Sequence, residues 1–151
     1  MECRTCLSLS GEKPLFPESR MYEGKYWVVE HAYPVSIKGW IVVMLKRHCE
    51  ALHELTQDEF KELAFLQEKI AKTMHTILKS KKEYIACFAE GKGFNHLHLH
   101  LIAKPQDLPE EFKGSAVFSL LKVKEENISL REDIINLCKQ IRKYLENSGS
   151  E

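Results

Sequence analysis

Asn95-His96-Leu97-His98-Leu99-His100-Leu101-Ile102 is the stretch from which the fold class follows. Three histidines alternate with three leucines, a period of two that is typical of a strand with one polar and one apolar face. The rise of a strand places neighbouring histidines at roughly 6.5–7 Å intervals. Three such histidines bind one metal ion with difficulty, but they can line an elongated anionic substrate. The alternative is a solvent-facing strand surface that happens to use histidine.

Four further segments predict strands, and we expect an antiparallel sheet of four to six strands. Residues 39–45 are rich in β-branched and aromatic side chains, as is typical of a central strand. Glu23-Gly24 separates two short runs, which predicts a hairpin. Pro105 ends the histidine strand, because proline cannot donate a hydrogen bond to a sheet. Beside the histidine strand, the predicted strands are 19–22, 25–30, 39–45 and 83–89.

Two helices are expected beside the sheet, which makes the fold class α+β. Thr56 and Glu59 form a capping-box signature at the start of the first helix. Apolar residues then recur at helical spacing to about Lys79, so one long helix should pack on a face of the sheet. A C-terminal helix is expected to follow a cap at Asn127 or Ser129. The segments before the hairpin and between the sheet and the C-terminal helix are expected to be irregular.

Length and composition are those of a single domain, 1–151, with a core of about 1–104 and a C-terminal extension, 105–151. The formal net charge is zero, so no global basic field attracts nucleic acid and none is expected as a partner. No apolar run approaches the ~18 residues of a membrane span. Charged residues occupy the place of a signal-peptide core, and the cysteines are spaced irregularly. We therefore expect a cytoplasmic protein.

Cys3 and Cys6 form a CxxC pair that opens the chain. Such a pair is typical of either a metal site or a redox centre. A structural zinc site is favoured here, because CxxC redox pairs usually open a helix that follows a strand. Two histidines would complete a tetrahedral Cys2His2 site. The candidates are His48 and His96, with His53 and Cys49 as competitors of His48.

His98, at the centre of the alternating run, is the candidate nucleophile. A neutral imidazole can attack an activated phosphorus and hold the transferred group as a phosphoramidate, which divides one displacement into two. His100 lies on the same face and could bind phosphate oxygens or protonate the leaving group, because imidazole has a pKa near neutrality. The alternative is that both histidines are surface ligands for adventitious metal.

Glu90-Gly91-Lys92-Gly93 turns the chain into the histidine strand. This turn could present backbone N–H groups and the Lys92 ammonium to an anion. The alternative is a tight hairpin turn with no ligand.

His96-Leu97-His98-Leu99-His100-Leu101-Ile102 resembles the His-φ-His-φ-His-φ-φ signature of the histidine triad (HIT) superfamily of nucleotide hydrolases and transferases. The order of elements from Cys3 to about Lys104 is similar as well: a CxxC pair, a hairpin, a Gly-led strand ending in Arg-His, a long helix and the triad strand. The resemblance implies a nucleophilic role for His98 and a homodimer built through the helix and an adjoining strand. It implies a structural zinc ion held by Cys3, Cys6, His48 and His96.

This sequence departs from the family pattern in three places. Where many members have an Asp or Asn that holds the ribose hydroxyls, the nearest candidate here is His31. The loop before the triad usually carries Gly-Gln-Ser or Gly-Gln-Thr, whereas this chain has Gly91-Lys92-Gly93 and lacks the hydroxyl. Lys92 and Gly93 are the substrate-binding candidates of this loop, and we expect Lys92 to take over part of the phosphate contact. The chain after Lys104 has no assigned counterpart.

The resemblance implies hydrolysis at the α-phosphorus of dinucleoside polyphosphates or nucleoside phosphoramidates through a nucleotidyl-histidine intermediate, with an adenine nucleotide as the expected substrate. Nucleotidyl transfer uses the same intermediate and is one alternative. A non-catalytic nucleotide-binding or zinc-stabilised interaction module is the other, and the altered loop before the triad keeps it open.

Overall fold

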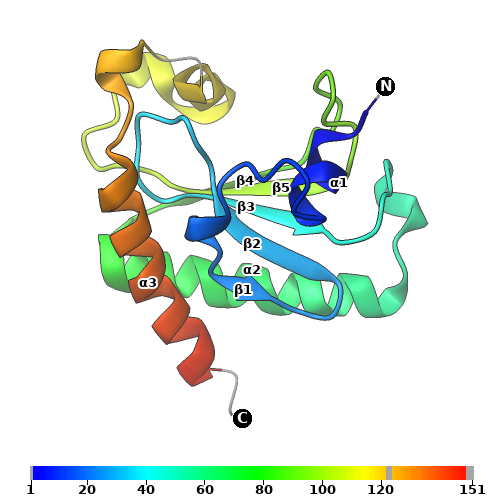
Figure 1. The fold of residues 1–151 in the computed structure, drawn as a ribbon. Helices are drawn as coiled ribbons and strands as arrows, with labels where there is room; N and C mark the ends of the chain where they lie inside the picture. Colours follow the sequence, from blue (N-terminus) through cyan, green and yellow to red (C-terminus); the bar gives the residue numbers. More distant parts are fainter. Residues whose placement is uncertain (1, 122–123, 149–151) are drawn as a thin grey trace.

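The computed structural model, which describes residues 2–121 and 124–148, confirms the α+β fold (Figure 1). Its centre is a five-stranded sheet of order β1-β2-β3-β5-β4, in which every neighbouring pair is antiparallel. The expected hairpin forms between the first two strands, and the expected central strand lies in the middle of the sheet. The strands are β1 (Tyr22–Glu23), β2 (Trp27–His31), β3 (Trp40–Leu45), β4 (Glu83–Ala86) and β5 (His98–Ala103).

Strand β5 has the two different faces that its alternating sequence predicts. The side chains of Leu99 and Leu101 are buried in the core, while His98 and His100 lie on the opposite face. The strand begins two residues later than expected, because the N–H of His96 donates to the carbonyl of Phe94 in a turn. Only two of the three histidines therefore belong to the regular strand.

The long helix α2 (Gln57–Leu78) covers the apolar face of the sheet (Figure 1). Its predicted capping box is present: the N–H of Glu59 donates to Thr56 Oγ1 at 3.2 Å, and the N–H of Thr56 donates to the Glu59 carboxylate at 2.8 Å. The helix ends at Leu78 and is capped by Lys79, whose φ of 57° is left-handed. Four apolar side chains on its inner face are buried in the core: Leu63, Leu66, Ile70 and Met74.

The N-terminal segment is not irregular throughout, contrary to the expectation. It contains a short helix, α1 (Arg4–Leu9), capped by Cys3, whose Sγ accepts a hydrogen bond from the N–H of Cys6 at 3.4 Å. The CxxC pair thus does open a helix, although no strand precedes it among the described residues. The cap provides an acceptor for the N–H of Cys6 at the start of α1, and the sequence pattern did not reveal this cap.

The C-terminal extension contains short 3-10 turns, including η4 (Gly114–Leu121), followed by helix α3 (Arg131–Ser148). Helix α3 begins later than predicted, so neither Ser129 nor Asn127 caps it. The N–H of Ser129 instead donates to the carbonyl of Val35 at 2.8 Å, which ties the extension to the loop between β2 and β3. Within the described ranges, no helix has both the length and the apolar character needed to cross a membrane.

Candidate functional site

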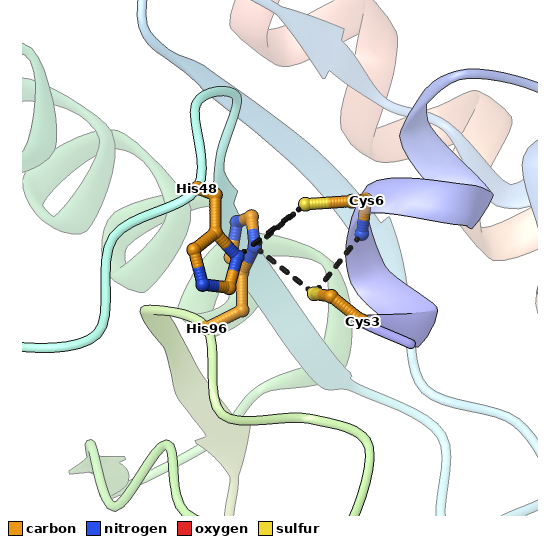
Figure 2. A group of neighbouring side chains, drawn as sticks. All are labelled: Cys3, Cys6, His48 and His96. Carbon is orange, nitrogen blue, oxygen red and sulfur yellow. Dashed lines mark hydrogen bonds between the residues drawn. The ribbon is translucent and has the colours of Figure 1, made fainter. Parts of the chain in front are cut away.

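Four potential metal ligands from three parts of the chain converge beside the start of β5 (Figure 2). Cys3 and Cys6 come from the beginning of α1, His48 from the loop after β3, and His96 from the turn before β5. Their ligand atoms all lie within 4.8 Å of one another. The Sγ–Nδ1 distances of Cys3–His96, Cys6–His48 and Cys6–His96 are each 3.5 Å. A tetrahedral Cys2His2 site requires about 3.5 Å between sulfur and nitrogen, so this cluster could bind a metal ion.

Outer hydrogen bonds orient both histidines of the cluster. Nε2–H of His96 donates to the carbonyl of Leu45 at 2.6 Å, and Nε2 of His48 lies 3.2 Å from the Glu50 carboxylate. Each bond occupies the outer ring nitrogen and turns Nδ1 toward the thiols, as is usual around metal-binding histidines. The competitors of His48 are not in the cluster: Cys49 donates from its thiol to the carbonyl of Ala51, and His53 is not among the converging side chains.

The two thiols of the cluster differ in acidity. Burial acts to raise the pKa of Cys3, but hydrogen bonds from the backbone N–H of Cys6 and from neighbouring side chains hold this pKa below its usual value. Burial and the adjacent Cys3 sulfur raise the pKa of Cys6 to about 11. A bound cation favours the thiolate form of each ligand, so metal binding at this cluster would release protons.

His98 is held in one orientation by the backbone of the residue two positions earlier. Its Nδ1 lies 2.7 Å from the carbonyl oxygen of His96, and a carbonyl can only accept, so Nδ1 carries the proton. In the neutral ring the lone pair is then on Nε2. His98 is half-buried and lines a cavity on this face of the sheet. The expected nucleophile therefore has an unshared electron pair on the nitrogen that is free of the backbone.

His100 lies next to His98, and the two rings are 5.1 Å apart in an edge-to-face arrangement. The indole N–H of Trp40 donates to Nδ1 of His100 at 2.9 Å. Burial, with the nearby His98 as a second cause, lowers the pKa of His100 to about 4. The ring is therefore neutral at pH 7. Sequence reasoning missed Trp40, although the alternation of β3 places it on the same face as Val42, the strand partner of His100.

The cavity lined by His98 and His100 has a volume of about 380 Å³. Its walls are largely apolar and aromatic, and the C-terminal extension contributes Phe118 and Leu121. The described lining residues include Glu30 and Glu90 but no Lys or Arg. The apolar run in residues 116–121 is the one sequence feature that could have indicated that the extension forms part of the cavity wall.

His31 does not have the free ring nitrogen that the expected ribose contact requires. Its Nδ1–H donates to the carbonyl of Ala32 at 2.7 Å, and its Nε2 accepts from the N–H groups of Gly39 and Trp40 at 2.9 and 3.3 Å. Burial lowers the pKa of His31 to about 4, which is consistent with a neutral ring that is fully bonded inside the protein. These bonds stabilise the loop between β2 and β3 and do not favour a ribose contact through the ring, so that contact stays a prediction.

Glu30 is the acidic residue that faces the cavity from the same strand. Its partner across the sheet is Val42, which is also opposite His100, so Glu30 lies on the face of the two strand histidines. The Arg20 guanidinium donates to its carboxylate from Nε and Nη2 at 2.9 and 2.6 Å. Burial nevertheless raises the pKa of Glu30 above its ordinary value. The period of two along β2 was the signal that could have identified it.

The turn before the triad contributes less to the cavity than expected. Gly91 lines the cavity, but Lys92 and Gly93 do not, and the Lys92 side chain is exposed. The carbonyl of Gly93 accepts from the N–H of Arg4 at 2.8 Å, and a Cβ on this glycine would meet the Arg4 side chain at 3.3 Å. Gly93 is thus in a structural contact with α1 rather than at the cavity wall. The phosphate contact of Lys92 remains a prediction.

The combination of fold and site defines a class of protein: an antiparallel sheet whose strand β5 presents paired imidazoles to an apolar cavity beside a Cys2His2 cluster. The sequence model of the HIT domain matches residues 15–107. The chain therefore belongs to the HIT family, as its triad motif predicted. The matched residues include the cavity histidines but end before the elements η4 and α3 of the extension.

Solved structures with the same fold cover nearly the whole chain. A zinc-bound histidine triad family protein from Mycobacterium smegmatis is 20% identical, with 97% of this chain and 96% of that chain covered and a TM-score of 0.69. A hypothetical histidine triad nucleotide-binding protein from Sulfolobus tokodaii is 23% identical, with coverage of 96% and 93% and a TM-score of 0.69. A diadenosine triphosphate hydrolase from Plasmodium falciparum is 16% identical, with coverage of 90% and 82% and a TM-score of 0.64. No curated protein matches the chain.

Proposed function

We propose that this protein is a nucleotide hydrolase that acts at the α-phosphorus through a nucleotidyl intermediate on His98. The observation that carries the proposal is the 2.7 Å bond from Nδ1–H of His98 to the His96 carbonyl, which leaves a lone pair on Nε2. That lone pair forms an N–P bond while the leaving group departs with the electron pair of its bond to phosphorus. Water then forms a new O–P bond and releases a proton, and the N–P electron pair returns to Nε2. This proton balances the one that the departing group takes up from solvent.

His100 is proposed to bind a phosphate oxygen rather than to act as the general acid. A ring whose pKa is about 4 is neutral at pH 7 and is a weak proton donor to a leaving group, whereas its N–H can donate a hydrogen bond. Such a donor stabilises the charge that builds up on phosphate oxygens in the transition state. The substrate-binding function expected for this residue is therefore favoured over proton transfer.

The charge of the cavity favours substrates that carry few phosphates. The Glu30 carboxylate of its described lining is already paired with Arg20, Glu90 is a second carboxyl group, and no Lys or Arg lines the cavity. Little positive charge is therefore present to offset a polyphosphate chain. We therefore propose that nucleoside phosphoramidates are better substrates than dinucleoside polyphosphates. An adenine nucleotide is proposed for the nucleoside part on family resemblance, and the Plasmodium falciparum relative is named a diadenosine triphosphate hydrolase.

The metal proposed for the Cys2His2 cluster is a structural zinc ion. The donor set of two thiols and two imidazoles suits zinc, and four protein ligands leave no open position for a catalytic water. The Mycobacterium smegmatis relative is described as zinc-bound. Such an ion would tie α1 to the turn that carries His96, and it would take no part in the displacement at phosphorus.

A homodimer is proposed to form through β4 and α2. Strand β4 is an edge of the sheet, and its Ile85 side chain is 54% exposed. On α2, Phe60 and Phe65 are also exposed, and exposed apolar groups and a free strand edge each favour association with a second copy. Light scattering after gel filtration tests this assembly, for which a monomeric mass is the contrary result.

A cytoplasmic location is proposed as well, because all five cysteines are free thiols.

The deciding experiment is intact-protein mass spectrometry after brief mixing with a panel of adenosine and guanosine phosphoramidates and dinucleoside polyphosphates. The proposal predicts a mass increase of one nucleotidyl group (a nucleoside monophosphate less one water) on wild type, no increase on His98→Ala, and release of the nucleoside monophosphate as product. Release of a product joined to an added phosphorylated acceptor would instead identify a transferase. Nucleotide binding with no adduct and no turnover would identify a binding module.

A further inference from the structure

Trp40 makes the one polar contact that the described residues offer to the ring of His100. Its indole N–H can only donate, so Nδ1 of His100, at 2.9 Å, must be the acceptor. In the neutral ring, the proton of His100 is then on Nε2. No described residue forms a hydrogen bond with Nε2. This atom is also absent from the fully buried side-chain atoms that lack a hydrogen-bond partner. Since His100 lines the cavity, Nε2 is accessible from it.

The described residues around His100 hold the ring but give it no competing hydrogen bond. Phe118 of η4 lies edge-to-face against it with ring centroids 4.9 Å apart, and Phe118 also packs against Trp40 at 5.3 Å. Val42 and Ala86 are its partners on the neighbouring strands. His98 is the titratable side chain that contacts it. The Trp40 indole is therefore the group that selects the tautomer of His100.

The two strand histidines are thus held in opposite tautomers. His98 has its proton on Nδ1 and donates it to the His96 carbonyl, so its Nε2 is a lone-pair donor. His100 accepts at Nδ1, so its Nε2 is a hydrogen-bond donor. One phosphoryl group facing both rings would meet a nucleophile from His98 and an N–H from His100. A ring of His100 in the other tautomer would present a second lone pair and repel phosphate oxygens.

We propose that Trp40 is a positioning residue that holds His100 in the neutral Nε2–H tautomer, so that His100 donates a hydrogen bond to the phosphoryl group attacked by His98. The catalytic effect of this tautomer rests on the proposed function, whereas the tautomer itself does not. The tautomer can be measured on the free protein, without substrate or turnover.

The test is long-range ¹H–¹⁵N correlation spectroscopy of the imidazole rings at pH 7.5, on wild type and on Trp40→Phe. The signals of His100 are identified by their loss in His100→Gln. Trp27→Phe is the matched control, because Trp27 is also fully buried and its indole N–H also donates one hydrogen bond, to the carbonyl of Glu59 on the opposite face. Steady-state kinetics on the same proteins, with an adenosine phosphoramidate, provides the functional measurement.

We expect wild type and Trp27→Phe to show the Nε2–H tautomer of His100 and Trp40→Phe to show a mixture of both tautomers. The kcat and kcat/KM of Trp40→Phe should fall together by roughly two- to tenfold, because the lost interaction acts in the transition state. A wild type with the proton on Nδ1, or a Trp40→Phe protein that keeps pure Nε2–H, would overturn the proposal. If Trp40→Phe does not fold, two measurements on wild type test the proposal instead. The His100 ring must be in the Nε2–H tautomer, and the indole N–H of Trp40 must exchange slowly with solvent. Failure of every nucleotide to react would contradict the proposed function and leave this spectroscopic result intact.

Discussion

The backbone carbonyl of His96 accepts a hydrogen bond from Nδ1–H of His98 at 2.7 Å, while Nδ1 of His96 points to the thiols of Cys3 and Cys6. One residue thus connects the candidate metal centre to the candidate nucleophile. The two residues are only two positions apart, so a shift of the His96 backbone would move the acceptor that orients the His98 ring. A metal ion that holds His96 would therefore stabilise the nucleophile without taking part in the reaction.

Replacement of His98 tests the nucleophile. We expect His98→Ala to lower kcat by on the order of 10³-fold or more, because neither the N–P bond nor the intermediate can form. The unfolding transition should change little, since the side chain faces the cavity. His53→Ala is the control, because His53 is exposed and lies outside the cavity and the metal cluster. Turnover close to that of wild type in His98→Ala would show that another group attacks phosphorus.

Removal of one thiol tests the metal centre. Wild type should contain about one zinc per chain, and Cys6→Ser should lose it and melt roughly 5–10 °C lower, because a structural ion contributes to folding. Cys87→Ser is a suitable control, since Cys87 is a half-buried free thiol outside the cluster. The measurements are elemental analysis and differential scanning calorimetry. Less than about 0.2 metal per chain in wild type, with all thiols titratable, would contradict a tight site.

The buried ring of His31 predicts a loss of stability in acid. Its folded pKa of about 4 lies below the ordinary value of 6.5, so the unfolded state binds more protons between these values. The free energy of unfolding therefore falls as the pH drops from about 6.5 toward 4, by on the order of 3 kcal/mol from this group at most. Urea unfolding at pH 7.5 and pH 5 should show a smaller loss for His31→Gln than for wild type. Equal losses in the two proteins would rule out this assignment.

Lys92 remains the candidate cation for a phosphate. Its side chain is exposed at the turn before the triad, where a flexible ammonium can reach an anion that enters the cavity. We expect Lys92→Met to weaken nucleotide binding roughly two- to fivefold at low salt, with the difference closing at high salt because exposed charges are screened. Calorimetric titration at both salt concentrations measures this effect. Lys81→Met, at an exposed position between α2 and β4, is the control, and equal affinities of Lys92→Met and wild type at low salt would exclude the contact.

The extension should influence substrate choice through Phe118, which forms a wall of the cavity beside His100. Phe118→Ala should open this wall and change the ratio of kcat/KM for a bulky and a small leaving group by roughly tenfold in favour of the bulky one. Leu120→Ala is the matched control in the same segment, since Leu120 does not line the cavity. An unchanged ratio in Phe118→Ala would mean that the leaving group lies elsewhere.

The sequence by itself determined the elements that depend on local patterns. The alternation of residues 96–101 predicted a strand with two different faces, and the capping box at Thr56 and Glu59 predicted where α2 begins. Both patterns work because the periodicity of a strand or helix and the satisfaction of terminal N–H groups are local physical requirements. The triad motif also identified the family, and with it the four residues that converge in the cluster.

Only the tertiary structure decided which ring nitrogens are free. His31, His98 and His100 are all buried to some degree beside the cavity, yet the partners of their rings lie at very different distances in the sequence. The His31 ring bonds to Ala32, Gly39 and Trp40, the His98 ring to His96, and the His100 ring to Trp40. These partners occupy every polar atom of the His31 ring but leave Nε2 of His98 and of His100 open. Imidazole chemistry depends on which nitrogen carries the proton. For His100 that choice is made by Trp40, which lies sixty residues away in the sequence and comes beside the ring only when β3 pairs with β5.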